Sequence, residues 1–236
     1  MSKNCRHTML KYDIFSAMES IRKYISNEEF DYQTLLHSLG RYSRPRDKIS
    51  DLLRKGAIIR VKKGIYIFGE DYRRRPFSRE ILANLIYGPS YISLEYALHY
   101  FGLIPERVEA VTSVTTGRSR KYATPVGLFR YRMIPLAAFR IGMDRIELDN
   151  GRSFLIATPE KALADKIRDD RGNGLQTQGQ LLDYLENNLR VDPAALTKLN
   201  NAHLGAIAHR YGSRKLQLLC NLLQRLERSS HEVDHA

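Results

Sequence analysis

Basic side chains are concentrated in one short part of the chain. Residues 41–75 contain twelve lysines and arginines against four acidic residues, an excess of eight within a total net charge of +12. Residues 1–40, by contrast, contain five basic and five acidic residues. Clustered positive charge attracts polyanions, so these residues predict an acidic partner or a nucleic acid. A uniform solubilising charge would be spread along the whole chain instead.

The segments before and within this basic window predict helices. The first helix is expected over residues 12–26, because apolar residues recur there at helical spacing: Ile14, Ala17, Met18, Ile21 and Ile25. Asp31 is a suitable N-cap for a short second helix, which Gly40 is expected to end in a left-handed conformation. The second helix would bury Leu35, Leu36 and Leu39.

A third helix is expected directly afterwards. Ser43 or Arg44 would cap it, Pro45 would lie in its first turn, and Gly56 would mark its end. Its predicted apolar stripe consists of Ile49, Leu52 and Leu53. The connection between the second and third helices is very short and includes a glycine, which is typical of a helix-turn-helix unit.

The sequence IIRVKKGIYIFG, residues 58–69, predicts a β-hairpin with a two-residue turn at Lys63-Gly64. This turn pairs Val61 with Tyr66, and Ile59 with Phe68. The predicted core face comprises Ile59, Val61, Tyr66 and Phe68, and the opposite face comprises Arg60, Lys62, Ile65 and Ile67. Three helices followed by a hairpin predict a winged helix-turn-helix with residues 62–64 at the wing tip.

A winged helix usually inserts its third helix into the major groove and places its wing against the DNA backbone or the minor groove. Arg44 and Arg46 are near the start of this helix, and we expect them to recognise bases, because arginine can donate two hydrogen bonds to guanine. The other predicted DNA-binding residues are Arg41, Ser43, Lys48, Arg54, Lys55, Arg60, Lys62 and Lys63. For any single cation, the alternative is an ordinary solvated surface.

Projection of the third helix places two acidic residues, Asp47 and Asp51, on its outer face together with Arg44, Arg54 and Lys55. They would repel phosphates unless they pair with Arg44, Arg54 or Lys55. An aspartate can also accept a hydrogen bond from cytosine, so these residues do not exclude DNA binding.

The rest of the chain predicts a separate mixed domain. We expect the winged helix to span residues 1–72, a polar linker to lie within 69–80, and a mixed α/β C-terminal domain with a helical end to span 78–228. The fold class is therefore α+β. Strands are predicted at 108–116, 127–134 and 145–157, and helices near 81–86 and at 181–189, 193–209 and 214–228. Two more helices are predicted from their caps: one with Ser93 as N-cap, and one with Thr158 as N-cap and Pro159 as the first helical residue. Asn150-Gly151 predicts a type I′ hairpin turn.

A second basic group lies between and within the predicted strands at 108–116 and 127–134: Arg118, Arg120, Lys121, Arg130 and Arg132. These residues belong either to a solvated loop and sheet face, or to a surface that binds an acidic protein or additional DNA backbone.

The sequence lacks common signatures of catalysis. It contains no Gly-Lys pair, no HExxH and no GxSxG, and no acidic residue is followed two positions later by lysine. Asp144, Glu147 and Asp149 form the nearest acidic cluster. We therefore expect no enzymatic activity, no cofactor and no metal.

The cysteine spacing and the length of the apolar segments indicate where the protein is located. Cys5 and Cys220 lack CxxC spacing, and no segment approaches the roughly 20 apolar residues that a membrane span requires. No apolar run at the N-terminus is long enough for a signal peptide. These features predict a cytoplasmic protein that does not enter membranes.

Several motifs together resemble a known family. LLRKGAIIRVKKGIYIFG, YISLEYALHYFGLIPE, VEAVTSVTTGRSRKY, GLFRYRMIP and FLIATPEKALADKI occur in this order within about residues 12–170. They resemble the AbiEi-type antitoxins and regulators of type IV toxin–antitoxin systems, which are associated with abortive phage infection. The resemblance implies a winged helix that binds inverted repeats in its own operator, an arrangement compatible with a dimer on DNA. It also implies a C-terminal domain that counteracts a co-encoded nucleotidyltransferase toxin.

The resemblance places the DNA contacts on the third helix and the wing. It places the 118–132 segment within the antitoxin region. Asp47 and Asp51 depart from a uniformly basic third helix, so the operator is expected to differ from others in the family. The helices at 181–228 could serve dimerisation, the antitoxin domain or neither. The alternative to the whole assignment is a winged-helix regulator whose C-terminal domain senses a ligand or a protein.

Overall fold

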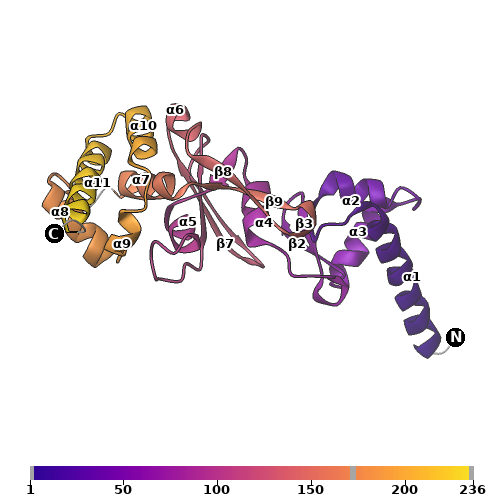
Figure 1. The fold of residues 1–236 in the computed structure, drawn as a ribbon. Helices are drawn as coiled ribbons and strands as arrows, with labels where there is room; N and C mark the ends of the chain where they lie inside the picture. Colours follow the sequence, from indigo (N-terminus) through magenta and orange to yellow (C-terminus); the bar gives the residue numbers. More distant parts are fainter. Residues whose placement is uncertain (1–2, 171–173, 234–236) are drawn as a thin grey trace. The chain divides into compact units, whose positions relative to one another are not determined.

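The protein is a mixed α+β molecule with helices at both ends (Figure 1). The computed structural model describes the backbone of residues 3–170 and 174–233. Two compact units are present. The first comprises the chain up to Ile86 together with Thr124–Val126, and the second comprises the remainder.

The first unit combines helices with a three-stranded antiparallel sheet of order β1-β3-β2. Its elements are α1 (Lys3–Tyr24), β1 (Glu29–Asp31), α2 (Tyr32–Ser38), α3 (Pro45–Arg54), β2 (Ile58–Lys62), β3 (Ile65–Phe68), a 3-10 turn (Glu70–Tyr72) and α4 (Arg79–Ile86). The three predicted helices are present, although α1 begins at Lys3 rather than near residue 12. Strand β1 was not predicted.

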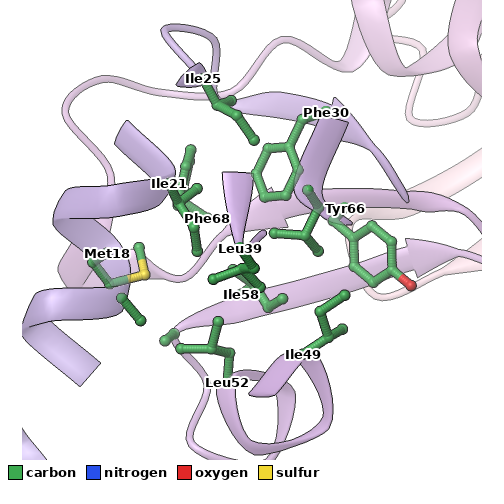
Figure 2. Close-up of a cluster of buried hydrophobic side chains, with 13 residues drawn as sticks. Met18, Ile21, Ile25, Phe30, Leu39, Ile49, Leu52, Ile58, Tyr66 and Phe68 are labelled. Atoms are coloured by element: carbon green, nitrogen blue, oxygen red, sulfur yellow. The ribbon is translucent and has the colours of Figure 1, made fainter. Parts of the chain in front are cut away.

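The core of the first unit is formed where the first three helices meet the hairpin (Figure 2). Met18 and Ile21 of α1, Leu52 of α3 and the aromatic side chains of Tyr66 and Phe68 are all buried there. Burial of large apolar side chains such as these contributes roughly 1.5–3 kcal/mol each. The apolar periodicity seen in the sequence therefore identified the faces of the helices that pack together.

The ends of α2 and α3 test the predicted capping. The side chain of Asp31 accepts a hydrogen bond from the Thr34 amide at 2.8 Å, as predicted. Gly56, after α3, has a φ of +70°, which also agrees with the prediction. The prediction of a left-handed Gly40 was wrong, because the amides of Leu39 and Gly40 instead bond to carbonyls three residues back. Those bonds close the helix without a left-handed residue.

The hairpin has the predicted turn but a different register. Gly64 has a φ of +90°, and Lys62 pairs with Ile65 across the turn. A β-bulge at Val61 then shifts the pairing, so that Arg60 lies opposite Tyr66. The predicted pairs of Val61 with Tyr66 and Ile59 with Phe68 were therefore wrong. Ile58, not Ile59, joins Tyr66 and Phe68 in the core.

The segment after the hairpin is attached to the first unit by a buried ion pair. Glu28 has no exposed surface, and its carboxylate accepts hydrogen bonds from the two terminal nitrogens of Arg22 at 3.2 and 2.8 Å. The same carboxylate accepts from the Arg74 amide, while the Arg22 guanidinium also donates to the Tyr72 carbonyl at 2.7 Å. Arg22 lies over the Phe68 ring, 3.5 Å from its centroid.

Further bonds extend this attachment along residues 73–86. Arg75 donates to the Ser26 carbonyl, and the Ser78 amide donates to Glu29. Residues 69–80, expected to be a linker, are thus bonded to the first unit. The division between the units accordingly falls at Ile86 rather than between residues 72 and 78.

The second unit contains a six-stranded mixed sheet of order β6-β7-β5-β4-β9-β8. Its strands are β4 (Ser90–Ile92), β5 (Val111–Thr115), β6 (Arg120–Thr124), β7 (Gly127–Met133), β8 (Met143–Glu147) and β9 (Ser153–Ala157). Strand β5 is parallel to β7, and β4 is parallel to β9. The pairs β4–β5 and β8–β9 are antiparallel. Strands β4 and β6 were not predicted.

The second unit also contains helices, and most of them follow the last strand, β9, in the chain. They are α5 (Leu94–Tyr100), α6 (Leu136–Phe139), α7 (Pro159–Asp169), α8 (Gln178–Asp183), a π-helical stretch (Tyr184–Asn188), α9 (Pro193–Leu196), α10 (Asn201–Tyr211) and α11 (Arg214–Val233). Helix α7 packs against α5, α10 and α11. The predicted cap and first turn of α7 are confirmed, because Thr158 accepts from the Lys161 amide and Pro159 is the first helical residue.

Three local predictions in the second unit were wrong. The single helix expected at 193–209 is two helices, because Asn200 caps a new helix by accepting from the His203 amide. Asn150-Gly151 is not a two-residue type I′ turn. Residues 149–151 form a 3-10 turn closed by a bond from the Leu148 amide to the Arg152 carbonyl. Ser93 precedes α5, but its hydroxyl donates to Asp165 instead of capping the helix.

We predict that Glu28→Ala destabilises the first unit by roughly 3–5 kcal/mol, because Arg22 would keep a buried charge without its partner. Hydrogen exchange of the β2–β3 amides measures this loss. Glu19→Ala, which removes an exposed carboxylate from α1, is the control and should stay within about 0.5 kcal/mol. Equal exchange in both variants would contradict a structural role for the Arg22–Glu28 pair.

Candidate nucleic-acid interface

The start of α3 presents two arginines to solvent. Arg44 occupies the N-cap position with its side chain 84% exposed, and Arg46 in the first turn is exposed as well. Asp47 lies 4.0 Å from Arg44, at the limit of an ion pair between exposed side chains. Such pairs are weak, so both guanidiniums remain able to bind an external group. Ser43 is also exposed beside them.

The end of α3 carries a compact charge cluster around Asp51. Its carboxylate accepts from Lys55 at 2.7 Å and from Arg54 at 2.5 Å. Burial acts to raise the pKa of Asp51, but the hydrogen bonds and charges of Lys55 and Arg54 outweigh it, so this pKa lies below its ordinary value. The acidic side chain that could have repelled phosphates is thus neutralised from within the helix.

The three basic side chains of the hairpin differ in their exposure to solvent. Arg60 and Lys63 are exposed, and neither side chain has a hydrogen bond or ion pair within the described part of the chain. Lys62 is half-buried, and its ammonium group donates to the Ile86 carbonyl at 2.6 Å. Lys62 therefore holds the end of α4, while Arg60 and Lys63 face outward.

Two further residues of the predicted set are engaged within the first unit. Lys48 is buried, and its ammonium group lies 5.3 Å from the centre of the Tyr42 ring. Arg41 donates to the Ser16 hydroxyl at 2.8 Å and to the Tyr42 hydroxyl at 3.2 Å. Tyr42 was missed as an organising residue, although an aromatic residue among closely spaced cations is a signal for cation–π contacts.

The arginines that follow the hairpin have structural partners. Arg73 donates to the Phe68 carbonyl at 3.1 Å, and Arg75 donates to the Ser26 carbonyl at 3.0 Å. The basic side chains of residues 41–75 thus fall into two groups. Some form hydrogen bonds within the first unit, and others extend into solvent from α3 and the hairpin.

The second basic group lies at one edge of the second unit's sheet. Arg118 precedes β6, Arg120 and Lys121 lie on β6, which is an outer strand, and all three are exposed. Arg130 and Arg132 are exposed on the neighbouring strand β7, where Phe129 and Tyr131 alternate with them and are buried. Arg132 pairs with Asp169 at 3.1 Å.

The described residues show neither a metal-binding cluster nor a membrane-spanning helix. That part of the chain contains no group of three or more histidine, cysteine, aspartate or glutamate side chains that could hold a metal ion. None of its helices combines the length and apolar character needed to cross a membrane.

We predict that Lys55→Met raises the pKa of Asp51 more than Arg54→Met does, because the Lys55 hydrogen bond contributes more to the lowering. Titration of the Asp51 carboxyl carbon by NMR measures both changes. A lowered pKa stabilises the fold above the ordinary value of 3.8, and this contribution is lost as pH falls through the folded-state pKa. An unchanged pKa in both variants would show that the cluster is not formed.

Comparison with known proteins assigns no family. No protein-family model matches the chain, and no curated protein matches it.

Proposed function

We propose that this protein is a DNA-binding repressor of its own operon and the antitoxin of a type IV toxin–antitoxin system. The first unit supports the repressor role, since α1, α2 and α3 are followed by the β2–β3 hairpin, the element order of a winged helix-turn-helix. In this proposal α3 enters the major groove, and the turn at Lys63-Gly64 is the tip of the wing.

The observation that carries the repressor proposal is the set of outward-facing cations on α3 and the hairpin. Arg44 and Arg46 lie at the start of α3, the end that usually meets base edges, so we assign base recognition to them. Arg54, Arg60 and Lys63 are exposed and suited to phosphates. Lys48 and Lys62 are left out, because one is buried and the other holds the Ile86 carbonyl.

The antitoxin role is supported by the family resemblance of the quoted motifs. Four of them lie in the second unit, and two of these four, YISLEYALHYFGLIPE and VEAVTSVTTGRSRKY, include most of β4 and all of α5 and β5. We therefore assign the antitoxin role to the second unit, with a co-encoded nucleotidyltransferase-like toxin as its functional partner. The proposal includes no catalytic activity for this chain.

We predict that Arg44→Ala combined with Arg46→Ala weakens binding to the DNA upstream of this gene and relaxes its sequence preference. Each lost base contact should cost about 1–3 kcal/mol. Fluorescence anisotropy with operator and scrambled duplexes measures both effects. Arg107→Ala with Arg145→Ala, which removes two exposed arginines of the second unit, is the charge-matched control. Unchanged specificity in the first variant would exclude α3 as the recognition helix.

The hairpin offers a matched pair of lysines for a second measurement. Lys63→Ala should lower the slope of log affinity against log salt by about one unit, because one phosphate contact is lost. Lys62→Ala should leave this slope unchanged, since the Lys62 side chain bonds to Ile86. A larger effect from Lys62 than from Lys63 would contradict the assigned wing tip.

We predict that the full-length Arg44→Ala, Arg46→Ala variant still rescues growth when the neighbouring nucleotidyltransferase-like gene is expressed. The second unit, which carries the antitoxin role in this proposal, is unchanged in that variant. Colony counts with toxin and antitoxin under separate inducible promoters measure the rescue. If wild-type protein gives no rescue either, the protein is a regulator without an antitoxin role.

A further inference from the structure

The second unit contains a cavity of about 370 Å³ beside α7 and α10. Its lining includes Asp165 and Arg168 of α7, Tyr211 of α10 and the apolar residues Met133 and Leu136. A neighbouring cavity of about 460 Å³ shares Arg168 and Tyr211 with the first. Volumes in this range are typical of small-molecule sites.

The Asp165 carboxylate in the lining of the first cavity is paired with other groups of the protein. The Asp165 carboxylate is 1% exposed, and it accepts hydrogen bonds from Lys161, from the Tyr211 hydroxyl and, at 2.6 Å, from the Ser93 hydroxyl. Burial and the neighbouring Asp165 charge raise the pKa of Tyr211 far above its ordinary value, so its hydroxyl stays protonated. Asp165 is therefore fully hydrogen-bonded, and its charge is paired with that of Lys161.

The cations of the two cavities are not all neutralised in this way. Asp169 pairs with Arg132 at 3.1 Å, and Lys215 donates to the Asp170 carbonyl at 2.8 Å. Arg168 and Arg214 are exposed, and their side chains have no hydrogen bond or ion pair among the described residues. Both line the 460 Å³ cavity. Two unpaired guanidiniums at one cavity favour a dianion, and the planar guanidinium donors match phosphate oxygens.

Part of the lining of the first cavity is apolar and exposed to solvent. Met133 and Leu136 are 62% and 53% exposed, which is unusual for large apolar side chains that lie close together. Leu94, also in the lining, is buried with a φ of +60°. A non-glycine residue in this left-handed region costs about 1–3 kcal/mol, and such residues cluster at ligand sites.

We propose that the second unit binds a small phosphorylated ligand that carries an apolar or aromatic group. The phosphate binds Arg168 and Arg214, and the apolar group packs against Met133 and Leu136. This site lies entirely within the second unit, and its occupation does not depend on DNA binding by the first unit.

The test uses full-length protein with AMP, adenosine and inorganic phosphate as probes, measured by isothermal titration calorimetry. AMP should bind more tightly than either adenosine or inorganic phosphate, because it alone engages both parts of the site. Arg168→Gln should weaken AMP binding by about tenfold or more, as expected for loss of a charged hydrogen bond. Arg140→Gln, which removes an exposed arginine of the same unit outside both cavities, should have no effect.

Two further variants separate the parts of the proposal. Met133→Ser should weaken AMP binding but leave inorganic phosphate unchanged. The Arg44→Ala, Arg46→Ala variant should bind AMP as the wild type does, so that failure of the repressor proposal is distinguishable. Absence of AMP and phosphate binding, or binding unaffected by both Arg168→Gln and Arg214→Gln, would overturn the site. Equal affinity for AMP and inorganic phosphate would overturn the apolar contact.

Discussion

A charge removed from water must be paired, and each unit of this protein contains an ion pair of buried side chains. In the first unit Arg22 pairs with the buried carboxylate of Glu28, and in the second unit Lys161 pairs with the buried carboxylate of Asp165. Burial lowers the pKa of Lys161, while Asp165 opposes that lowering. Each pair also bonds to segments far apart in the sequence, so it holds together parts of the chain that no local interaction joins. The cavity beside α7 is lined by Asp165 itself and by Tyr211, which bonds to Asp165.

Much of the fold follows from local rules. Apolar periodicity predicted the helices of the first unit, and Lys63-Gly64 predicted its hairpin turn. The bulge at Val61 could not be foreseen, because Ile58, Ile59 and Val61 are all β-branched and suit either register. Strands β1 and β4 have only three residues each, which is too short for an alternating pattern to be visible.

The sequence could predict which basic side chains of the candidate interface are exposed only where exposure depends on a single helix. Projection around α3 placed Arg44 and Arg54 outside, and both are exposed. The positions of Lys48 and Lys62 depend on groups from other elements, namely the Tyr42 ring and the Ile86 carbonyl. Arg168 and Arg214 are far apart in the sequence, and only the packing of α7 with α10 and α11 brings them to one cavity. Their proximity has no signature in the sequence.

The two outer strands of the six-stranded sheet both carry exposed charged side chains, which affect how copies of the chain associate. Exposed Arg120 and Lys121 lie on β6, and exposed Asp144, Arg145 and Glu147 lie on β8. An outer strand offers unpaired backbone groups to which a strand of another molecule can add, and charged side chains oppose this addition. The charged side chains on β6 and β8 thus oppose edge-to-edge aggregation of the protein, whether or not a ligand is bound.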